Sequence, residues 1–144
     1  MREIKFRGKR IDNDEWVYGN LVVDSGYCRI ITNVGRYLEP YPIECRGYTV
    51  ATETVGQYIG LDADNKKKVY EGDILGIDGY SYYEPEGGCF GVVGIGAFGN
   101  GLEIYENGEI KDFQYLSDMG GSYTTTYTVF GNIHDNPELI KEVE

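Results

Sequence analysis

Residues 3–32 read EIKFRGKRIDNDEWVYGNLVVDSGYCRIIT, and they already indicate the class of fold. Apolar and polar residues alternate through residues 3–11, as in a strand with one buried face and one solvated face. β-Branched and aromatic residues then fill residues 16–23 and, after a second polar turn, residues 27–32. Connections this short join antiparallel neighbours. The stretch therefore predicts a three-stranded antiparallel meander.

The remainder of the chain continues the β pattern, with turns between the strands. Further strands are expected at residues 50–60, 69–77, 89–97, 102–105, 110–113 and 124–133. Asn107-Gly108 favours a type I′ hairpin turn, because both residues accept positive φ. Residues 33–47, which contain two prolines, are interpreted as a loop or as short edge segments, and residues 78–88 are interpreted as a loop.

Glycine is frequent at two places where the strand pattern bends. Gly72, within Glu71-Gly72-Asp73, permits a tight bend into a barrel strand at no steric cost. Residues 91–96 alternate glycine with apolar residues, which weakens a strand but allows sharp curvature or the close approach of another backbone. A glycine-rich phosphate cradle would end in Gly-Lys-Ser/Thr and lead into a helix, and neither feature follows here.

A helix is expected only at the end of the chain. Asn136 is suited to the N-cap, Pro137 to the first helical position, and Glu138 to the positive end of the helix dipole. A helix this short needs packing on a sheet, and three apolar residues share the face that would provide it: Leu139, Ile140 and Val143.

These patterns together predict a mainly β protein. We expect antiparallel strands in a small SH3-like or β-barrel arrangement, with one short C-terminal helix. The chain is expected to form a single domain over residues 1–144, or two interlocked β lobes with a boundary near residue 78.

Composition narrows the class of protein further. The 144 residues are 41% hydrophobic, enough for a core. No apolar run reaches the length of about 18 residues that a membrane span requires. The basic N-terminus is followed by alternating residues instead of the apolar block of a signal peptide. We therefore expect a cytoplasmic protein.

Cysteine and metal-ligand spacing predicts no cofactor and no metal site. Cys28, Cys45 and Cys89 lie far apart, and His134 is the only histidine, so a four-ligand zinc site is not indicated. The cysteines are interpreted as reduced, small apolar residues. The polar run 62–65 is interpreted as a turn and not as a calcium loop, because lysines follow it and no bidentate glutamate closes it.

Three separated segments carry a recognisable pattern. They are residues 1–10 with 16–19 (MREIKFRGKR and WVYG), 54–61 with 69–74 (TVGQYIGL and VYEGDI), and 131–133 with 136–139 (GNI and NPEL). In this order they resemble the YopX family of phage and prophage proteins. The resemblance implies a phage- or prophage-encoded cytoplasmic protein of mostly β fold that forms homo-oligomers. It implies no activity and no site residues, and residues 78–128 match no pattern of that family.

Charge is distributed unevenly along the chain. Residues 1–70 hold 11 basic and 10 acidic side chains, whereas residues 71–144 hold 2 basic and 14 acidic ones, for a total of −11. Such asymmetry indicates contacts with a partner or between subunits. The plainer interpretation is that the basic first strand pairs with the acidic half of the same or a neighbouring subunit.

The first functional hypothesis is a non-enzymatic interaction module that forms a homo-oligomer, with a host or phage protein as a further partner. Its candidate interaction surface combines basic and aromatic residues near the N-terminus: Arg2, Lys5, Arg7, Lys9, Arg10, Trp16 and Tyr18. Aromatic residues often anchor interfaces, and Tyr80, Tyr82 and Tyr83 are further candidates. Ordinary core packing is an equal alternative for Trp16 and Tyr18.

Two other classes of function stay open. A small β-barrel that binds nucleic acid is favoured by the basic, aromatic first strands but opposed by the net charge of −11. A variant of this idea is an acidic DNA mimic that occupies a host DNA-binding protein. An enzyme would use Glu71 and Asp73, which an extended strand would place on one face, although a turn with solvated or capping carboxylates fits them better.

Overall fold

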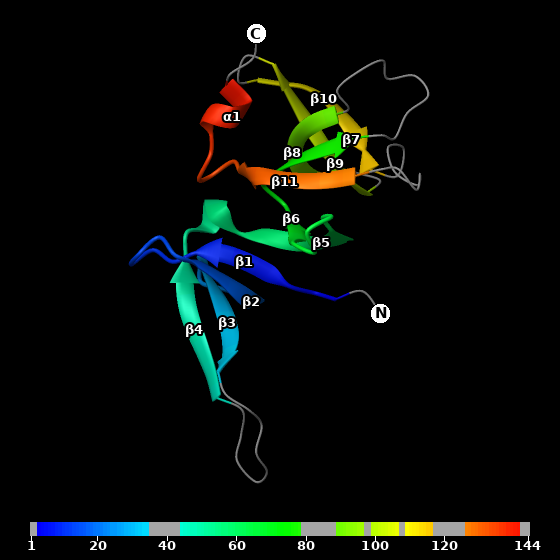
Figure 1. The fold of residues 1–144 in the computed structure, drawn as a ribbon. Helices are drawn as coiled ribbons and strands as arrows, with labels where there is room; N and C mark the ends of the chain where they lie inside the picture. Colours follow the sequence, from blue (N-terminus) through cyan, green and yellow to red (C-terminus); the bar gives the residue numbers. More distant parts are fainter. Residues whose placement is uncertain are drawn as a thin grey trace. The chain divides into compact units, whose positions relative to one another are not determined.

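The computed structural model describes residues 3–34, 44–78, 89–96, 99–106, 109–116 and 126–141. Its strands form two antiparallel sheets (Figure 1), which confirms the mainly β prediction. The chain divides into two compact units, Met1–Tyr58 and Ile59–Glu144. These limits differ from the boundary expected near residue 78, and the domain interpretation stays a prediction. No helix in the described ranges is long and apolar enough to cross a membrane.

The first unit contains the N-terminal meander. Its elements are β1 (Phe6–Lys9), β2 (Trp16–Asp24), β3 (Tyr27–Val34), β4 (Glu44–Val50), the 3-10 helix η1 (Thr52–Thr54) and the start of β5 (Gly56–Asp62). The strand order of the first sheet is β4-β3-β2-β1-β5-β6, in which β6 is Lys68–Tyr70. The expected meander therefore forms, and β5 adds to the other edge of β1 through Phe6 and Arg7.

The turn between β2 and β3 follows from its two central residues. Ser25 and Gly26 both have positive φ, 50° and 83°, as a type I′ turn requires. The turn closes on the cross-strand pair Asp24 and Tyr27. This two-residue connection fixes the register of the hairpin along its whole length.

The core of the first unit lies on one face of the meander. Its buried residues are packed against partly buried apolar side chains of neighbouring strands: Cys28, Ile30 and Val50 with Phe6, Val17, Leu21 and Val55. A Cβ at Gly8 would lie 2.8 Å from Val50 Cγ2, so only glycine fits there. The end of β4 also meets the end of β1, through an isolated bridge between Arg10 and Val50.

The second unit contains the other sheet. Its elements are β7 (Asp73–Asp78), β8 (Cys89–Gly96), β9 (Gly99–Glu106), β10 (Glu109–Tyr115), β11 (Thr126–Asn132) and the helix α1 (Glu138–Lys141). The strand order is β10-β9-β8-β7-β11. Phe130 is an extra residue where the β11 register shifts between Val129 and Gly131. The strands and helix expected here form, whereas Asn107-Gly108 and the expected loop at 79–88 lie outside the described residues.

Two apolar clusters hold the second unit together, one on each face of the sheet. The larger one contains Ile59, Ala63, Val69, Leu75, Ile77, Val93 and Leu102. On the other face, Ile140 of α1 packs with Ile74 and Val92. The short helix is therefore stabilised by apolar contact with the sheet, as the sequence predicts. The Asn136 side chain is directed towards the end of β11, because its Oδ1 accepts a hydrogen bond from the Asn132 N–H at 3.3 Å.

The glycines of the second sheet accommodate aromatic rings. A Cβ at Gly76 would lie 2.5 Å from the ring of Phe130, and one at Gly101 would lie 2.6 Å from the ring of Phe113. The sequence suggested curvature or the approach of a backbone at residues 91–96, and a Cβ at Gly91 would lie 2.6 Å from the Glu103 carbonyl oxygen. The contacts with rings were not expected. Glycine is required at these positions because a ring lies across the sheet where a side chain would stand.

Two local predictions are resolved by the strands. Of the two interpretations of residues 33–47, a loop or short edge segments, the second holds for residues 44–47, which belong to the edge strand β4; β4 pairs with β3 from Val50 opposite Cys28 to Glu44 opposite Val34. Both prolines precede β4 in the sequence, so they do not interrupt its ladder. Residues 50–60, by contrast, are not one strand, because η1 separates β4 from β5.

The side chain of Thr54 explains why the chain turns at η1. Its hydroxyl donates to the Ala51 carbonyl at 2.6 Å and accepts from the Lys9 N–H at 2.9 Å. A threonine that bonds nearby backbone in this way competes with strand formation. The threonines of η1 therefore stabilise a turn, although β-branched residues generally favour strands.

Candidate interaction surface

The register of β1 and β2 brings together four of the residues proposed for the interaction surface. Arg7 lies opposite Tyr18, and Lys9 lies opposite Trp16. Residues two apart on a strand share a face, so all four side chains stand on the face of β1 and β2 that is turned away from Phe6 and Val17. The alternation of the sequence therefore predicted this grouping.

The cations of this face stack on its tryptophan. The Arg7 guanidinium carbon lies 4.6 Å from the centroid of the Trp16 ring, and the Lys9 ammonium lies 5.7 Å from it. Both distances are within the range of cation–π attraction. Arg7 is only 4% exposed. Much of the basic, aromatic character of this face is thus engaged within the protein itself.

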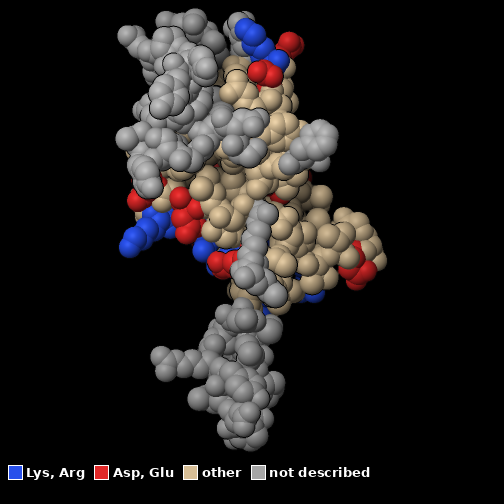
Figure 2. All heavy atoms as spheres, turned by 90° about the vertical axis from the view of Figure 1, so that its right-hand side faces the viewer, with Lys and Arg blue, Asp and Glu red and all other residues tan. Residues whose placement is uncertain are grey.

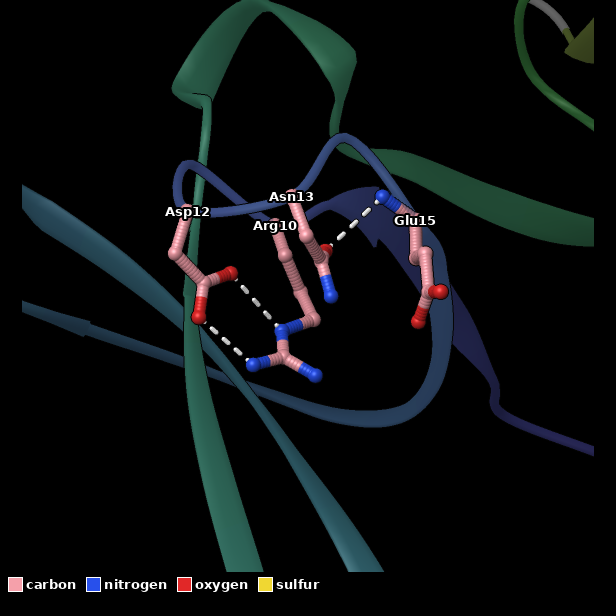
Figure 3. A network of polar contacts seen from close by, with 4 residues as sticks. All are labelled: Arg10, Asp12, Asn13 and Glu15. Atoms are coloured by element: carbon pink, nitrogen blue, oxygen red, sulfur yellow. Dashed lines mark hydrogen bonds and ion pairs between the residues drawn. The ribbon is translucent and has the colours of Figure 1, made fainter.

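Arg10 has a different role, because it shapes the connection between β1 and β2 (Figure 3). Its Nε and a terminal nitrogen donate to the two carboxylate oxygens of Asp12, at 2.9 and 2.6 Å. This bidentate pair lowers the pKa of Asp12 below its ordinary value. The guanidinium also lies 4.4 Å from the centroid of the Tyr48 ring. The structure therefore does not place Arg10 with the Trp16 cluster, and Arg2 lies outside the described residues.

Lys5 lies at the start of the face, beside a shallow groove. Its carbonyl accepts a hydrogen bond from the Tyr58 N–H at 2.8 Å, which continues the pairing of β1 with β5. The groove has a volume of about 320 Å³. Its lining residues come from the chain before β1 and from β2 and β3: Glu3, Ile4, Lys5, Tyr18, Gly19, Asn20, Ile31 and Thr32.

The β2–β3 hairpin exposes apolar side chains that the sequence analysis did not single out. Val22 is 44% exposed, and Val23 and Tyr27 are each 66% exposed. A signal was available in the sequence, because Leu21, Val22 and Val23 are consecutive apolar residues in a strand. In such a run at least one side chain must leave the core face. These residues extend the candidate surface beyond the basic residues.

The carboxylates considered for an enzyme do not share a strand face. Glu71 lies in the turn between β6 and β7 with Gly72, whose φ is 90°. Asp73 begins β7, is 1% exposed, and accepts a hydrogen bond from the Tyr70 N–H at 2.8 Å. The Gly72 carbonyl accepts from the Ile133 N–H at 2.9 Å. This arrangement gives Asp73 and Gly72 a structural role in closing the turn and joining it to the residues after β11.

Polar pairs in the second unit also support its strands. Asp64 accepts from the Tyr127 N–H at 2.8 Å and donates its own N–H to the Tyr127 carbonyl at 3.0 Å. The Tyr105 hydroxyl donates to Glu103 Oε2 at 3.1 Å. Burial, together with this carboxylate, raises the pKa of Tyr105 to about 12. Asp64 therefore belongs to a turn, as expected for residues 62–65.

The described charged side chains form no broad patch of one sign in Figure 2, where basic and acidic groups lie interspersed among uncharged atoms. Within the described ranges, no group of three or more histidine, cysteine or acidic side chains is arranged to hold a metal ion. Cys28 is a free, buried thiol of the first core. The side chains of Cys45 and Cys89 lie outside what the structure describes.

Comparison with known proteins places the fold and the family. The structure is similar to the crystal structure of protein EF1440 from Enterococcus faecalis, with a TM-score of 0.53 and 20% sequence identity. The similarity covers 97% of this chain and 99% of that chain, and it concerns the fold alone. No curated protein sequence matches the chain. The family model for YopX protein matches residues 5–141, and this range includes residues 78–128, where the sequence had shown no family pattern. Because this match spans nearly the whole sequence, the chain belongs to the YopX family.

Proposed function

We propose that this YopX-family chain is a phage- or prophage-encoded, cytoplasmic and non-enzymatic interaction module that assembles as a homo-oligomer. The observation that carries the proposal is the set of apolar side chains exposed on the β2–β3 hairpin: Val22, Val23 and Tyr27. Exposed apolar side chains that cluster at one end of a sheet are typical of protein contact surfaces. Tyr18, exposed beside the groove, continues this surface along β2.

The roles of the polar residues support the same proposal. Asp73 closes a turn, Asp12 pairs with Arg10, and Asp64 binds the backbone of Tyr127. Each of these carboxylates has a geometric reason to be where it is. None of them has to be assigned to acid–base chemistry to explain its position.

Light scattering coupled to size-exclusion chromatography tests the assembly. We expect a single species of the full chain at micromolar concentration, with a mass that is a whole multiple of the 16.2 kDa chain. A species with the mass of one chain at all accessible concentrations would contradict the proposal. Affinity capture from host cells, followed by identification of the recovered protein and nucleic acid, tests for further partners.

We further propose that β1–β4 of the first unit close into a small SH3-like barrel. The support is the contact between the first and last of these strands. The Ala51 N–H donates to the Lys9 carbonyl at 2.8 Å, and the Ile11 N–H donates to the Thr49 carbonyl at 3.2 Å. These bonds flank the bridge between Arg10 and Val50.

Nucleic-acid binding is the second candidate, and the shared face of Lys9, Trp16 and Tyr18 favours it. Two observations weaken it: Arg7 is buried, and the Trp16 ring is already contacted by two cations. Titration of labelled single-stranded and duplex DNA at low salt tests this candidate. Salt-sensitive binding that is lost in Lys9→Ala would support it, and no binding would exclude it. The acidic DNA mimic stays a prediction, to be tested by capture of a host DNA-binding protein.

A further inference from the structure

One edge of β2 is covered over only half of its length. β1 pairs with β2 from Trp16 to Gly19 and no further. Residues 3–5, before β1, belong to no strand, and the Lys5 carbonyl accepts a hydrogen bond from the Tyr58 N–H of β5. On the other edge, β3 pairs with β2 from Asn20 to Asp24. Opposite this second half of β2, no described strand continues the sheet.

The hairpin turn determines which backbone groups face the uncovered edge. In an antiparallel ladder, residues alternate between bonding to one neighbour and to the other. A two-residue turn makes Asp24 and Tyr27 a hydrogen-bonded pair, so Asp24, Val22 and Asn20 bond to β3. The N–H and C=O groups of Leu21 and Val23 therefore point to the uncovered edge.

We infer that this edge pairs with the same edge of a second copy of the chain, antiparallel about a two-fold axis at Val22. This inference rests on the proposed homo-oligomeric function and assigns a surface to it. Leu21 of each copy exchanges two backbone hydrogen bonds with Val23 of the other. Val22 then faces Val22 of the second copy in a non-hydrogen-bonded pair, where side chains come closest. The β2–β3 sheets of the two copies become continuous.

The sequence of this edge is complementary to itself in that register. On one face Leu21 meets Val23 of the second copy, and on the other the two Val22 side chains meet. Asn20 stands opposite Asp24 of the second copy, so an amide donor faces a carboxylate and two like charges do not face each other. Val22, Val23 and Asp24 are all exposed in the single chain, so the pairing would bury apolar surface now in contact with water.

The groove provides room for the ends of this pairing. In the same register the turn of the second copy, at Ser25 and Gly26, comes opposite Gly19, where β1 begins to cover the edge. Gly19 and Asn20 line the groove of about 320 Å³. The turn of the second copy would enter it from the side of β2.

Charge substitution at Val22 tests the inference in the full chain. Lysine at this exposed position would place two ammonium groups opposite each other across the two-fold axis, which opposes pairing. We expect Val22→Lys and Val22→Glu each to lower the mass measured by light scattering about twofold, as loss of a two-fold contact requires. A mixture of the two variants in equal amounts should restore the mass, because lysine then faces glutamate.

The matched control is Ile11→Lys, which adds the same charge at a residue of the first unit that is 63% exposed and lies outside the edge. It should keep the mass of the wild type, and circular dichroism should show the same β content in all variants. If Val22→Lys keeps the oligomer, or if the mixture restores nothing, this pairing is wrong while the proposed homo-oligomer stands. A wild-type chain that is monomeric would overturn both.

Discussion

The two sheets differ in the side chains and hydrogen bonds that lie along their strand edges. In the second sheet, the backbone of Tyr127 on the edge strand β11 is bonded on its outer side by Asp64. The opposite edge strand, β10, carries exposed Glu109, Lys111 and Asp112 around one exposed apolar residue, Ile110. In the first sheet, the uncovered half of β2 carries Leu21, Val22 and Val23. Charges and side-chain bonds prevent pairing at sheet edges, and an apolar edge invites it. The difference supports our proposal that the first unit supplies the contact surface.

The largest effect should come from opening the core of the second unit. Ile74 is fully buried and packs with Val92 and Ile140. Ile74→Ala should lower the free energy of unfolding by about 2–5 kcal/mol, because it removes apolar contacts and leaves a cavity. Chemical denaturation measures this change. Ile95→Ala, at an exposed position of the same sheet, is the control and should change stability by less than about 0.5 kcal/mol. Equal losses in both variants would contradict the assigned core.

Removal of the Asp64 carboxylate should make the edge strand β11 more prone to pair with another chain, as we propose for β2 of the first sheet. Asp64→Ala removes the acceptor of the Tyr127 N–H, so we expect a loss of about 0.5–1.5 kcal/mol of stability. It also leaves the Tyr127 N–H on the outer edge of β11 without this acceptor, so concentration-dependent association should increase. Sedimentation velocity measures the association, and Asp64→Asn, which keeps an acceptor oxygen, should show a smaller effect. If Asp64→Ala associates no more than the wild type, Asp64 does not protect this edge.

The smallest effect concerns how stability depends on pH at two polar pairs, Tyr105 with Glu103 and Asp12 with Arg10. The first pair should lose its contribution in base and the second in acid. The pKa of Tyr105 is raised from 10.0 to about 12, so the stability contributed by its neutral form is complete below pH 10 and is lost as the pH rises towards 12. The pKa of Asp12 is lowered by Arg10, so its contribution is lost in acid as the carboxylate becomes protonated.

The raised pKa of Tyr105 can be measured by titrating tyrosinate absorbance in the wild type and in Tyr105→Phe. The difference between the two titrations should show one group with a pKa near 12. A difference centred near the ordinary value of 10.0 would mean that Glu103 and burial do not act on this hydroxyl. Stability of Asp12→Asn in acid checks the second effect, since this variant should lose less stability than the wild type as the pH falls.

Much of the fold follows from local patterns in the sequence. The alternation in residues 3–11 predicted β1 and the shared face of Arg7 and Lys9, because strand geometry alone determines that arrangement. The polar residues before Tyr27 likewise predicted a tight turn. Pro137 and the apolar residues after it predicted α1, since its start signal and its packing face are both local.

Other features depend on partners that are distant in the sequence. The rings that lie across Gly76 and Gly101 belong to other strands, so the sequence next to these glycines could not indicate them. The role of Thr54 in η1 depends on Lys9 of β1. The uncovered edge of β2 depends on where β1 begins, at Phe6 opposite Gly19. Local propensity could not predict that β1 covers only part of β2. This partial pairing creates the uncovered edge that we propose as the contact surface.

Hydrogen exchange at the amides of β2 tests the central claim most directly. Val22 bonds to β3 within one chain, so its amide should be protected at every protein concentration. The amides of Leu21 and Val23 should be protected only in the assembly, and their exchange should become faster on dilution. Fast exchange of Leu21 and Val23 at all concentrations, in a chain whose mass shows it to be an oligomer, would contradict the claim that β2 supplies the contact.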